Sequence, residues 1–252
     1  MKRNKIWPMN LGLSFGVDKG KVVYGIQGET ITTATIAYLV RTGRENILVD
    51  TGAGDPKWAL KYHKSKRENL EKYQITFALR RLGLSPLDID VVINTHLHWD
   101  HCSNNHLFKN ADIFVQDEEL RFAICPLPIC ALGYESQIVG MTPPWLKALK
   151  QIKTVKGDKD IIHGISLIHL PGHTPGLQGV CVETRKGIYV IASDLCMLFE
   201  NWEGNSISRH IPSSIFVNLE DHYKSFEKVE KIAAFVLPGH DPKVFQNKFY
   251  PL

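Results

Sequence analysis

The sequence predicts a mixed α+β fold in a single domain, and three observations support this prediction. Short β-rich apolar runs recur in both halves of the chain, separated by turns and by segments of helical character. The 252 residues are 44% hydrophobic, which is enough to bury one large core. No linker rich in Pro, Gly or Ser and no internal repeat divides the chain, so residues 1–252 are interpreted as one domain.

Eight runs with β-forming composition are predicted as strands. In chain order they are residues 36–40, 47–50, 90–94, 113–116, 165–170, 180–183, 188–192 and 234–237. The first two flank RTGREN as a hairpin, and the sixth and seventh pair across TRKG. Helices are predicted at residues 73–82, 117–124 and 219–231. The basic segment 57–72 is interpreted as a helix with Trp58, Tyr62 and Leu70 available for burial and its cations in solvent.

Composition and charge exclude several classes of protein. The net charge is only +4, and the broad basic surface with interleaved aromatic residues that nucleic-acid binding needs is not found. The start, MKRNKIWPMNLGLSFG, is basic but lacks the apolar stretch of a secretion signal or membrane anchor. The five cysteines lack a disulfide-framework spacing and are interpreted as buried thiols. We therefore expect a cytoplasmic protein with no nucleic-acid or membrane partner.

The most informative feature is a spaced set of histidines and aspartates. Its members are His96, His98, Asp100 and His101 in NTHLHWDHCSN, His173 in LPGHTPG, Asp194 in IASDLC and His240 in LPGHDP. A single histidine of this kind could be a hydrogen-bonded loop or core residue. The whole set favours a site for two divalent metal ions, because imidazole and carboxylate are the usual ligands of such sites.

The spacing also suggests how these side chains meet. Side chains alternate along an extended chain, so His96 and His98 can point the same way while Leu97 turns into the core. Asp100 and His101 follow a turn and can face a second ion. The later ligands each follow a β-rich run, and two of these runs end abruptly at Pro-Gly. Four strand ends are therefore expected to converge on one place.

The motif HxHxDH, followed by a later His, Asp and His, resembles the metallo-β-lactamase-fold hydrolases. The resemblance extends from LVDTG at residues 48–52 to PGHDPKVF at residues 238–245, and it implies a four-layer αββα sandwich. It also implies that one metal binds His96, His98 and His173, that the other binds Asp100, His101 and His240, and that Asp194 bridges them. Zinc is the expected ion, although these ligands also suit iron, manganese or cobalt. Asp50 matches the family aspartate that orients a ligand imidazole, or is an ordinary strand-end turn residue.

This ligand set predicts the chemistry of the site. Two dications about 3.5–4 Å apart lower the pKa of a bridging water towards neutrality, so the expected nucleophile is hydroxide. One metal can also stabilise the oxyanion of a tetrahedral intermediate. Asp100 and Asp194 are predicted as catalytic residues because they can steer or accept the proton of that water.

Comparison with known branches of the fold favours hydrolysis over redox chemistry. Class B β-lactamases carry cysteine or histidine at the position of Asp194, and oxygen-reducing diiron relatives carry glutamate at that of His98. No GxSxG elbow accompanies the histidines, which disfavours a serine hydrolase. The stretches PGHTPGLQGVCVET, SDLCMLFEN, RHIPSSI and LPGHDPKVF resemble the N-acyl-homoserine lactonase branch. This resemblance implies a quorum-quenching lactonase for these or other small lactones, and a homodimer.

One residue departs from the lactonase pattern. The branch has a tyrosine three residues after the bridging aspartate, where this chain has Met197, which cannot donate a hydrogen bond. Met197 is either core packing or is compensated by another donor, such as Tyr134, His210 or Tyr223. Trp99, Leu107 and Phe108 are predicted either to form an apolar wall beside the metals or to be core.

Two other functions stay open. A glyoxalase-II-like thioesterase or other carboxylic ester hydrolase would use the same motif. That thioesterase usually has a C-terminal helical region, whereas this sequence has only twelve residues after His240. A binding protein that has lost catalysis would be expected to lack ligands, and all seven are present.

Overall fold

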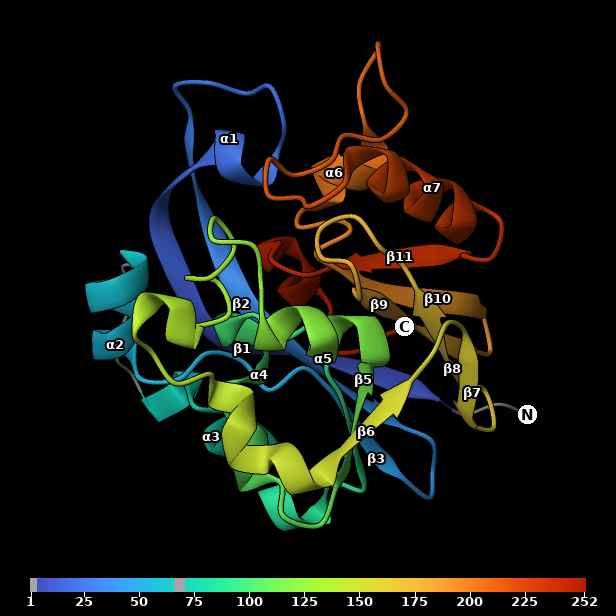
Figure 1. The fold of residues 1–252 in the computed structure, drawn as a ribbon. Helices are drawn as coiled ribbons and strands as arrows, with labels where there is room; N and C mark the ends of the chain where they lie inside the picture. Colours follow the sequence, from blue (N-terminus) through green and yellow to red (C-terminus); the bar gives the residue numbers. More distant parts are fainter. Residues whose placement is uncertain (1–3, 66–70) are drawn as a thin grey trace.

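The computed structural model describes residues 4–65 and 71–252, and in this part of the chain eleven strands form two mixed sheets (Figure 1). The first sheet has six strands in sequence order: β1 (Lys5–Asp18), β2 (Thr30–Arg41), β3 (Asn46–Val49), β4 (Val91–Ile93), β5 (Asp112–Gln116) and β6 (Ile152–Val155). The second has five, in the order β11 (Phe235–Pro238), β10 (Gly187–Ser193), β9 (Gln178–Thr184), β8 (Ile165–His169) and β7 (Lys159–Ile162).

Both predicted hairpins are confirmed. β2 pairs with β3 in antiparallel register, with Tyr38 opposite Val49, and β9 pairs with β10, with Val182 opposite Tyr189. From β3 to β6 the strands of the first sheet are parallel, and β10 and β11 are also parallel. Parallel neighbours end at the same edge of a sheet, so the segments after β3 and β4 leave the first sheet together, as do those after β10 and β11.

Seven α-helices lie in the described part of the chain: α1 (Lys19–Val22), α2 (Pro56–His63), α3 (Ile75–Arg80), α4 (Trp99–Cys102), α5 (Asp117–Ile124), α6 (Phe199–Glu203) and α7 (Leu219–Glu230). Six 3₁₀ segments accompany them: Glu71–Tyr73, Pro86–Asp88, Asn105–Leu107, Gln137–Val139, Pro144–Gln151 and Pro242–Gln246. None of these described helices has the length and apolar character needed to cross a membrane.

Side-chain alternation along the strands produces the layers. In β2, Leu39 faces a core shared with α3 and α5, whereas Tyr38 faces the core between the two sheets. In β10, Ile191 faces the same inter-sheet core, whereas Val190 packs with Phe226 of α7 on the opposite side. Helices thus cover the outer face of each sheet, as Figure 1 shows for α7 over the second sheet. The predicted four-layer αββα sandwich is confirmed.

The first strand was not predicted from the sequence. β1 contains Pro8, Gly12 and Gly16, which ordinarily argue against a strand, and its pairing with β2 shifts register between Asn10 and Leu13 and again between Ser14 and Val17. Gly12 and Gly16 adopt positive φ of 132° and 67°. The irregular register accommodates residues that break a regular ladder, so the strand lacks a clean alternating pattern.

Two helix predictions need correction. The helix predicted at residues 57–72 ends at His63, because Lys64 adopts a left-handed φ of 55°. Its Trp58 is 41% exposed, so the expected burial of that side chain is wrong, while Leu70 lies outside the described residues. The helix predicted at 73–82 is shorter, Ile75–Arg80, whereas 117–124 is confirmed as α5 and 219–231 as α7 to within one residue.

The cysteines are free thiols, as the sequence indicates. Cys102, Cys181 and Cys196 are buried, in agreement with the prediction. Cys125 is exposed and Cys130 half-buried, so for these two the expected full burial is wrong.

Candidate metal centre

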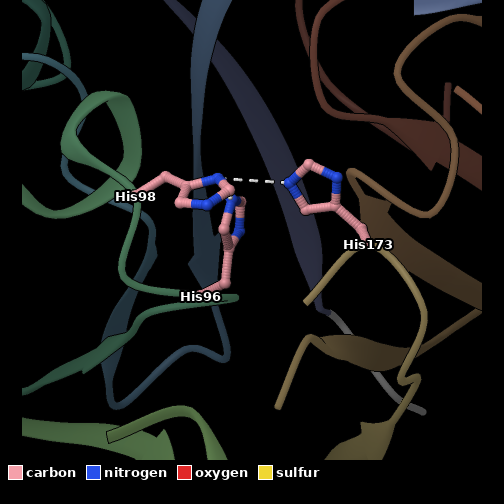
Figure 2. Close-up of side chains that lie close together, drawn as sticks. All are labelled: His96, His98 and His173. Atoms are coloured by element: carbon pink, nitrogen blue, oxygen red, sulfur yellow. Dashed lines mark hydrogen bonds between the residues drawn. The ribbon is translucent and has the colours of Figure 1, made fainter. Parts of the chain in front are cut away.

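Three imidazoles converge where two strands end. His96 and His98 follow β4, and His173 follows β8 after the Pro-Gly turn. Leu97 is fully buried in the core, as its alternate position predicts. The Nδ1 atom of His98 lies 3.0 Å from Nε2 of His96 and 3.2 Å from Nε2 of His173. Figure 2 shows the three rings pointing toward one another, with His96 and His98 from one segment and His173 from another.

A second group lies beside the first. The expected turn after His98 is the short helix α4, which carries Asp100 and His101. His240 reaches them from the end of β11. Its Nε2 atom lies 3.9 Å from Oδ2 of Asp100, and Nε2 of His101 lies 3.9 Å from Oδ1 of Asp100.

Asp194, at the end of β10, lies between the two groups. Its Oδ2 atom is 3.4 Å from Nε2 of His173 and 4.0 Å from Nε2 of His96. Its Oδ1 atom is 3.2 Å from Nε2 of His240 and 3.5 Å from Nε2 of His101. One oxygen of a single carboxylate therefore faces each group, and all seven predicted side chains meet in one place.

The surrounding protein holds the outward nitrogens of three imidazoles that are predicted to be ligands. Nδ1 of His173 lies 2.7 Å from the carbonyl oxygen of Ile215, and Nδ1 of His240 lies 2.8 Å from that of Ala34. Nδ1 of His101 lies 2.8 Å from Oδ2 of Asp50. A proton on each Nδ1 leaves Nε2 unprotonated and directed at the cluster, which is the tautomer that binds a metal.

Asp50 therefore contacts a predicted ligand directly. It is 3% exposed, accepts hydrogen bonds from both the amide and the hydroxyl of Thr95, and has a left-handed φ of 60°. Non-glycine residues in that region cost free energy and persist where the surroundings fix them. Of its two interpretations, contact with the His101 imidazole is the one that the structure supports.

The charges of the cluster are strongly coupled. Burial, helped by the neighbouring His173, lowers the pKa of His98 to about 3. Burial also opposes the charged form of His101, but Asp194, Asp100 and Asp50 outweigh it and raise the pKa of His101 to about 10. The pKa of Asp194 stays well below its usual value despite burial, because His240 and His101 stabilise the carboxylate.

The donor set fits divalent metal ions. Nitrogens bound tetrahedrally to one zinc at about 2.0–2.1 Å would lie about 3.3 Å apart, close to the separations around His98. Nε2 of His101 is buried and has no hydrogen-bond partner among the described residues, as expected of an atom reserved for a metal. The donor atoms lie within 4.8 Å of one another in each of three groups: His96, His98 and His173; His96, His101 and Asp194; Asp100, His101 and His240.

The structure distinguishes between the two interpretations given for apolar side chains near the centre. Phe108 is fully buried in the helix-side core, so the core interpretation is right and an apolar wall including Phe108 is not. Trp99 is half-buried and stacks on His63, with ring centroids 4.0 Å apart. A cavity of about 920 Å³ near Trp58 and Asn104 has none of the seven predicted ligands in its lining, so it lies outside the candidate centre.

Sequence reasoning missed Glu119 entirely. Glu119 is fully buried and lies against both ligand-bearing loops of the first group. In the sequence, Glu119 is only the third acidic residue in the first turn of a predicted helix. An acidic residue at such a position ordinarily faces solvent, so the sequence does not mark Glu119 as part of the centre.

Comparison with known proteins agrees with this geometry. A family model described as the metallo-beta-lactamase superfamily matches residues 32–240. The chain belongs to this superfamily. The match begins within β2 and ends just after β11, and therefore includes all seven residues of the candidate centre.

Individual members of the superfamily are similar over most of the chain. An N-acyl homoserine lactonase from a Bacillus species is 29% identical over 225 residues, which cover 85% of this chain and 84% of the relative. One from Bacillus cereus is 28% identical over 230 residues with the same coverage. A solved structure of a B. thuringiensis AiiA mutant, with N-decanoyl-L-homoserine bound at the active site, superposes with a TM-score of 0.76 at 25% identity, covering 98% of this chain and 96% of that one. The chain is a hydrolase of the metallo-beta-lactamase superfamily.

Proposed function

We propose that this hydrolase is a lactonase that binds two divalent metal ions, with zinc as the expected metal. The observation that carries the proposal is the carboxylate of Asp194, whose two oxygens face two separate groups of imidazoles at 3.2–4.0 Å. His96, His98 and His173 would hold one ion, and Asp100, His101 and His240 the other. The negative charge of Asp194 would offset both.

We assign different roles to the two aspartates, Asp194 and Asp100. Two divalent ions bound here would supply a bridging hydroxide near neutral pH and polarise the carbonyl of the substrate. Asp194 is 4% exposed in its side chain and is held by imidazoles, so its role is to keep the two ligand groups together. Asp100 is 24% exposed, so it can reach a water molecule and a substrate. We assign to it the transfer of the remaining proton of the added hydroxide to the ring oxygen that leaves, so that ring opening yields a carboxylate and an alcohol.

The lactone substrate is proposed from the relatives. Two N-acyl homoserine lactonases are 28–29% identical over 85% of this chain. Met197 is 4% exposed and packs in an apolar cluster with Val22, Leu198 and Ile211. The core-packing interpretation of Met197 agrees with this position, and the side chain offers no hydrogen-bond donor.

The three candidate replacement donors have other contacts. The Tyr134 hydroxyl donates to Glu119 at 2.8 Å, and the His210 nitrogens lie at 2.6 Å from the Trp202 carbonyl and at 2.8 Å from Glu230. Tyr223 lies 39% exposed near Ser208. We therefore propose that the substrate oxygens depend on the metals or on water, and that homoserine lactones are poorer substrates than another lactone.

A substrate panel tests this proposal. Protein of measured metal content would be assayed with homoserine lactones of several chain lengths, other γ- and δ-lactones, and thioesters. The expected result is two metal ions for each chain and hydrolysis of at least one lactone that exceeds hydrolysis of every thioester. Thioesters as the best substrates would favour the glyoxalase-II-like alternative, and protein that binds no metal would overturn the proposal.

Exchange at Met197 separates the role of a hydroxyl from that of an aromatic ring. Met197→Tyr adds both, and Met197→Phe adds the ring alone. A donor to a developing oxyanion is worth about 10²–10³ in rate. If the pocket fits a homoserine lactone, Met197→Tyr should raise its turnover above that of both the wild type and Met197→Phe. Equal rates in the two variants, with equal metal content, would mean that the pocket is not arranged to use a hydroxyl at position 197 on a homoserine lactone.

A further inference from the structure

Glu119 is a fully buried carboxylate outside the proposed metal ligands. It belongs to the first turn of α5, whose neighbouring acids are exposed to solvent: the Asp117 side chain is 21% exposed and that of Glu118 is 63% exposed. Glu119 is 0% exposed. Burial of a carboxylate is costly unless hydrogen bonds replace its water, so its donors indicate why it is there.

Those donors come from the two loops that carry the first imidazole group. Oε1 of Glu119 accepts a hydrogen bond from the amide of Leu97 at 2.9 Å, and Leu97 lies between His96 and His98. Oε2 accepts one from the amide of Gly176 at 3.2 Å, three residues after His173. One carboxylate therefore connects two segments that are 79 residues apart, the difference between 176 and 97.

Packing reinforces these hydrogen bonds. A Cβ atom added to Gly176 would lie 2.2 Å from the backbone nitrogen of Glu119, so the start of α5 lies directly against the loop after His173. Tyr134 donates to Oε1 of Glu119 at 2.8 Å, and its ring contacts the His98 ring edge-on, with centroids 4.6 Å apart. The environment of Glu119 thus extends to all three imidazoles of the group.

We propose that Glu119 is a positioning residue that fixes His96, His98 and His173 in the geometry that binds the first metal. The inference rests on the proposed two-metal function. Glu119 contacts neither metal nor substrate; it acts through the backbone of both ligand loops. Losing this connection should weaken the first metal site more than the second, because Asp50 and the backbone around His240 hold the second group independently.

Glu119→Gln tests this role with little change of shape. The amide retains one acceptor oxygen but turns an NH₂ group toward a backbone N–H donor. Glu118→Gln, one residue away with an exposed side chain, is the matched control for charge. The stepwise dissociation constants of zinc would be measured by chelator competition, and the step lost in His173→Ala identifies the first site. The melting temperatures of the metal-free proteins would be measured separately by thermal unfolding.

The expected result is a dissociation constant at the first site raised about 10–100-fold in Glu119→Gln, with the second site and the Glu118→Gln control changed less than about threefold. Equal affinities in Glu119→Gln and wild type, even with a lower melting temperature, would overturn the positioning role and leave Glu119 as a structural residue only. If Glu119→Gln does not fold, Tyr134→Phe removes one donor and should still weaken the first site several-fold. No change there would also overturn the inference. Wild-type protein that binds fewer than two ions would instead contradict the proposed function.

Discussion

Replacing Asp50 by asparagine should weaken the metal site that contains His101. In the wild type, Oδ2 of Asp50 lies 2.8 Å from Nδ1 of His101, and Oδ1 accepts from the amide of Thr95 at 2.8 Å. If the asparagine oxygen faces the Thr95 amide, its NH₂ group faces Nδ1 of His101. The imidazole must then carry its proton on Nε2, the atom directed at the metal. The opposite amide orientation leaves two N–H donors facing each other in a buried site.

When Nε2 of His101 is unprotonated and can bind a metal, either orientation leaves a buried N–H donor without an acceptor, which costs about 1–3 kcal/mol. Because about 1.4 kcal/mol corresponds to a factor of ten, zinc affinity at this site should fall about 5–150-fold. Chelator competition on purified protein measures the change. Asp55→Asn is the control, because it removes the same charge from the exposed N-cap of α2, where asparagine caps equally well. Unchanged affinity at both sites in Asp50→Asn would refute the argument from the tautomer.

Three further results are expected. The Asp194→Asn variant should lose at least one metal ion and its turnover should fall by orders of magnitude, while the chain stays folded. Metal analysis and a rate assay measure these changes. Two retained ions with near-normal turnover would contradict the proposal that Asp194 bridges the two ions. Metal binding at pH 7 should release protons and should strengthen as pH rises, because His101 has a pKa of about 10 without metal and must lose its proton to bind a metal ion. Calorimetry in buffers of different ionisation enthalpy measures the proton release. A heat of binding that does not depend on the buffer would disprove the release. Lactones with longer acyl chains should bind more tightly by up to about 0.8 kcal/mol for each buried methylene, and Trp99→Ala should flatten this dependence on chain length. If the dependence is the same in Trp99→Ala and wild type, Trp99 does not form part of an apolar wall against the acyl chain.

The sequence predicts the cluster of the candidate metal centre better than its surroundings, for a physical reason. Ligands must be particular residue types at strand ends, so His96, His98 and Asp194 are visible in the sequence. What holds them is less specific. Backbone carbonyls such as that of Ile215 can belong to any residue type, and a glutamate in the first turn of a helix ordinarily faces water.

The same distinction explains the errors in the fold. The strand at 36–40 was predicted because its residues face two apolar cores, which requires apolar side chains throughout. β1 was missed because its glycines and Pro8 are tolerated only through irregular pairing with β2, which local sequence does not reveal. The helix over 57–72 was predicted too long because the left-handed turn at Lys64 carries no glycine.

The arrangement of ligands on both sheets has a consequence for how the protein withstands heat. His96, His98, Asp100 and His101 follow a strand of the first sheet, and His173, Asp194 and His240 follow strands of the second. Each bound ion would therefore act as a cross-link between two layers that otherwise adhere through the apolar core between them. Ions that bind only the folded chain add about 2.7 kcal/mol to its stability at a free concentration one hundred times the dissociation constant. The lifetime of this enzyme in a cell should then rise and fall with the local supply of metal.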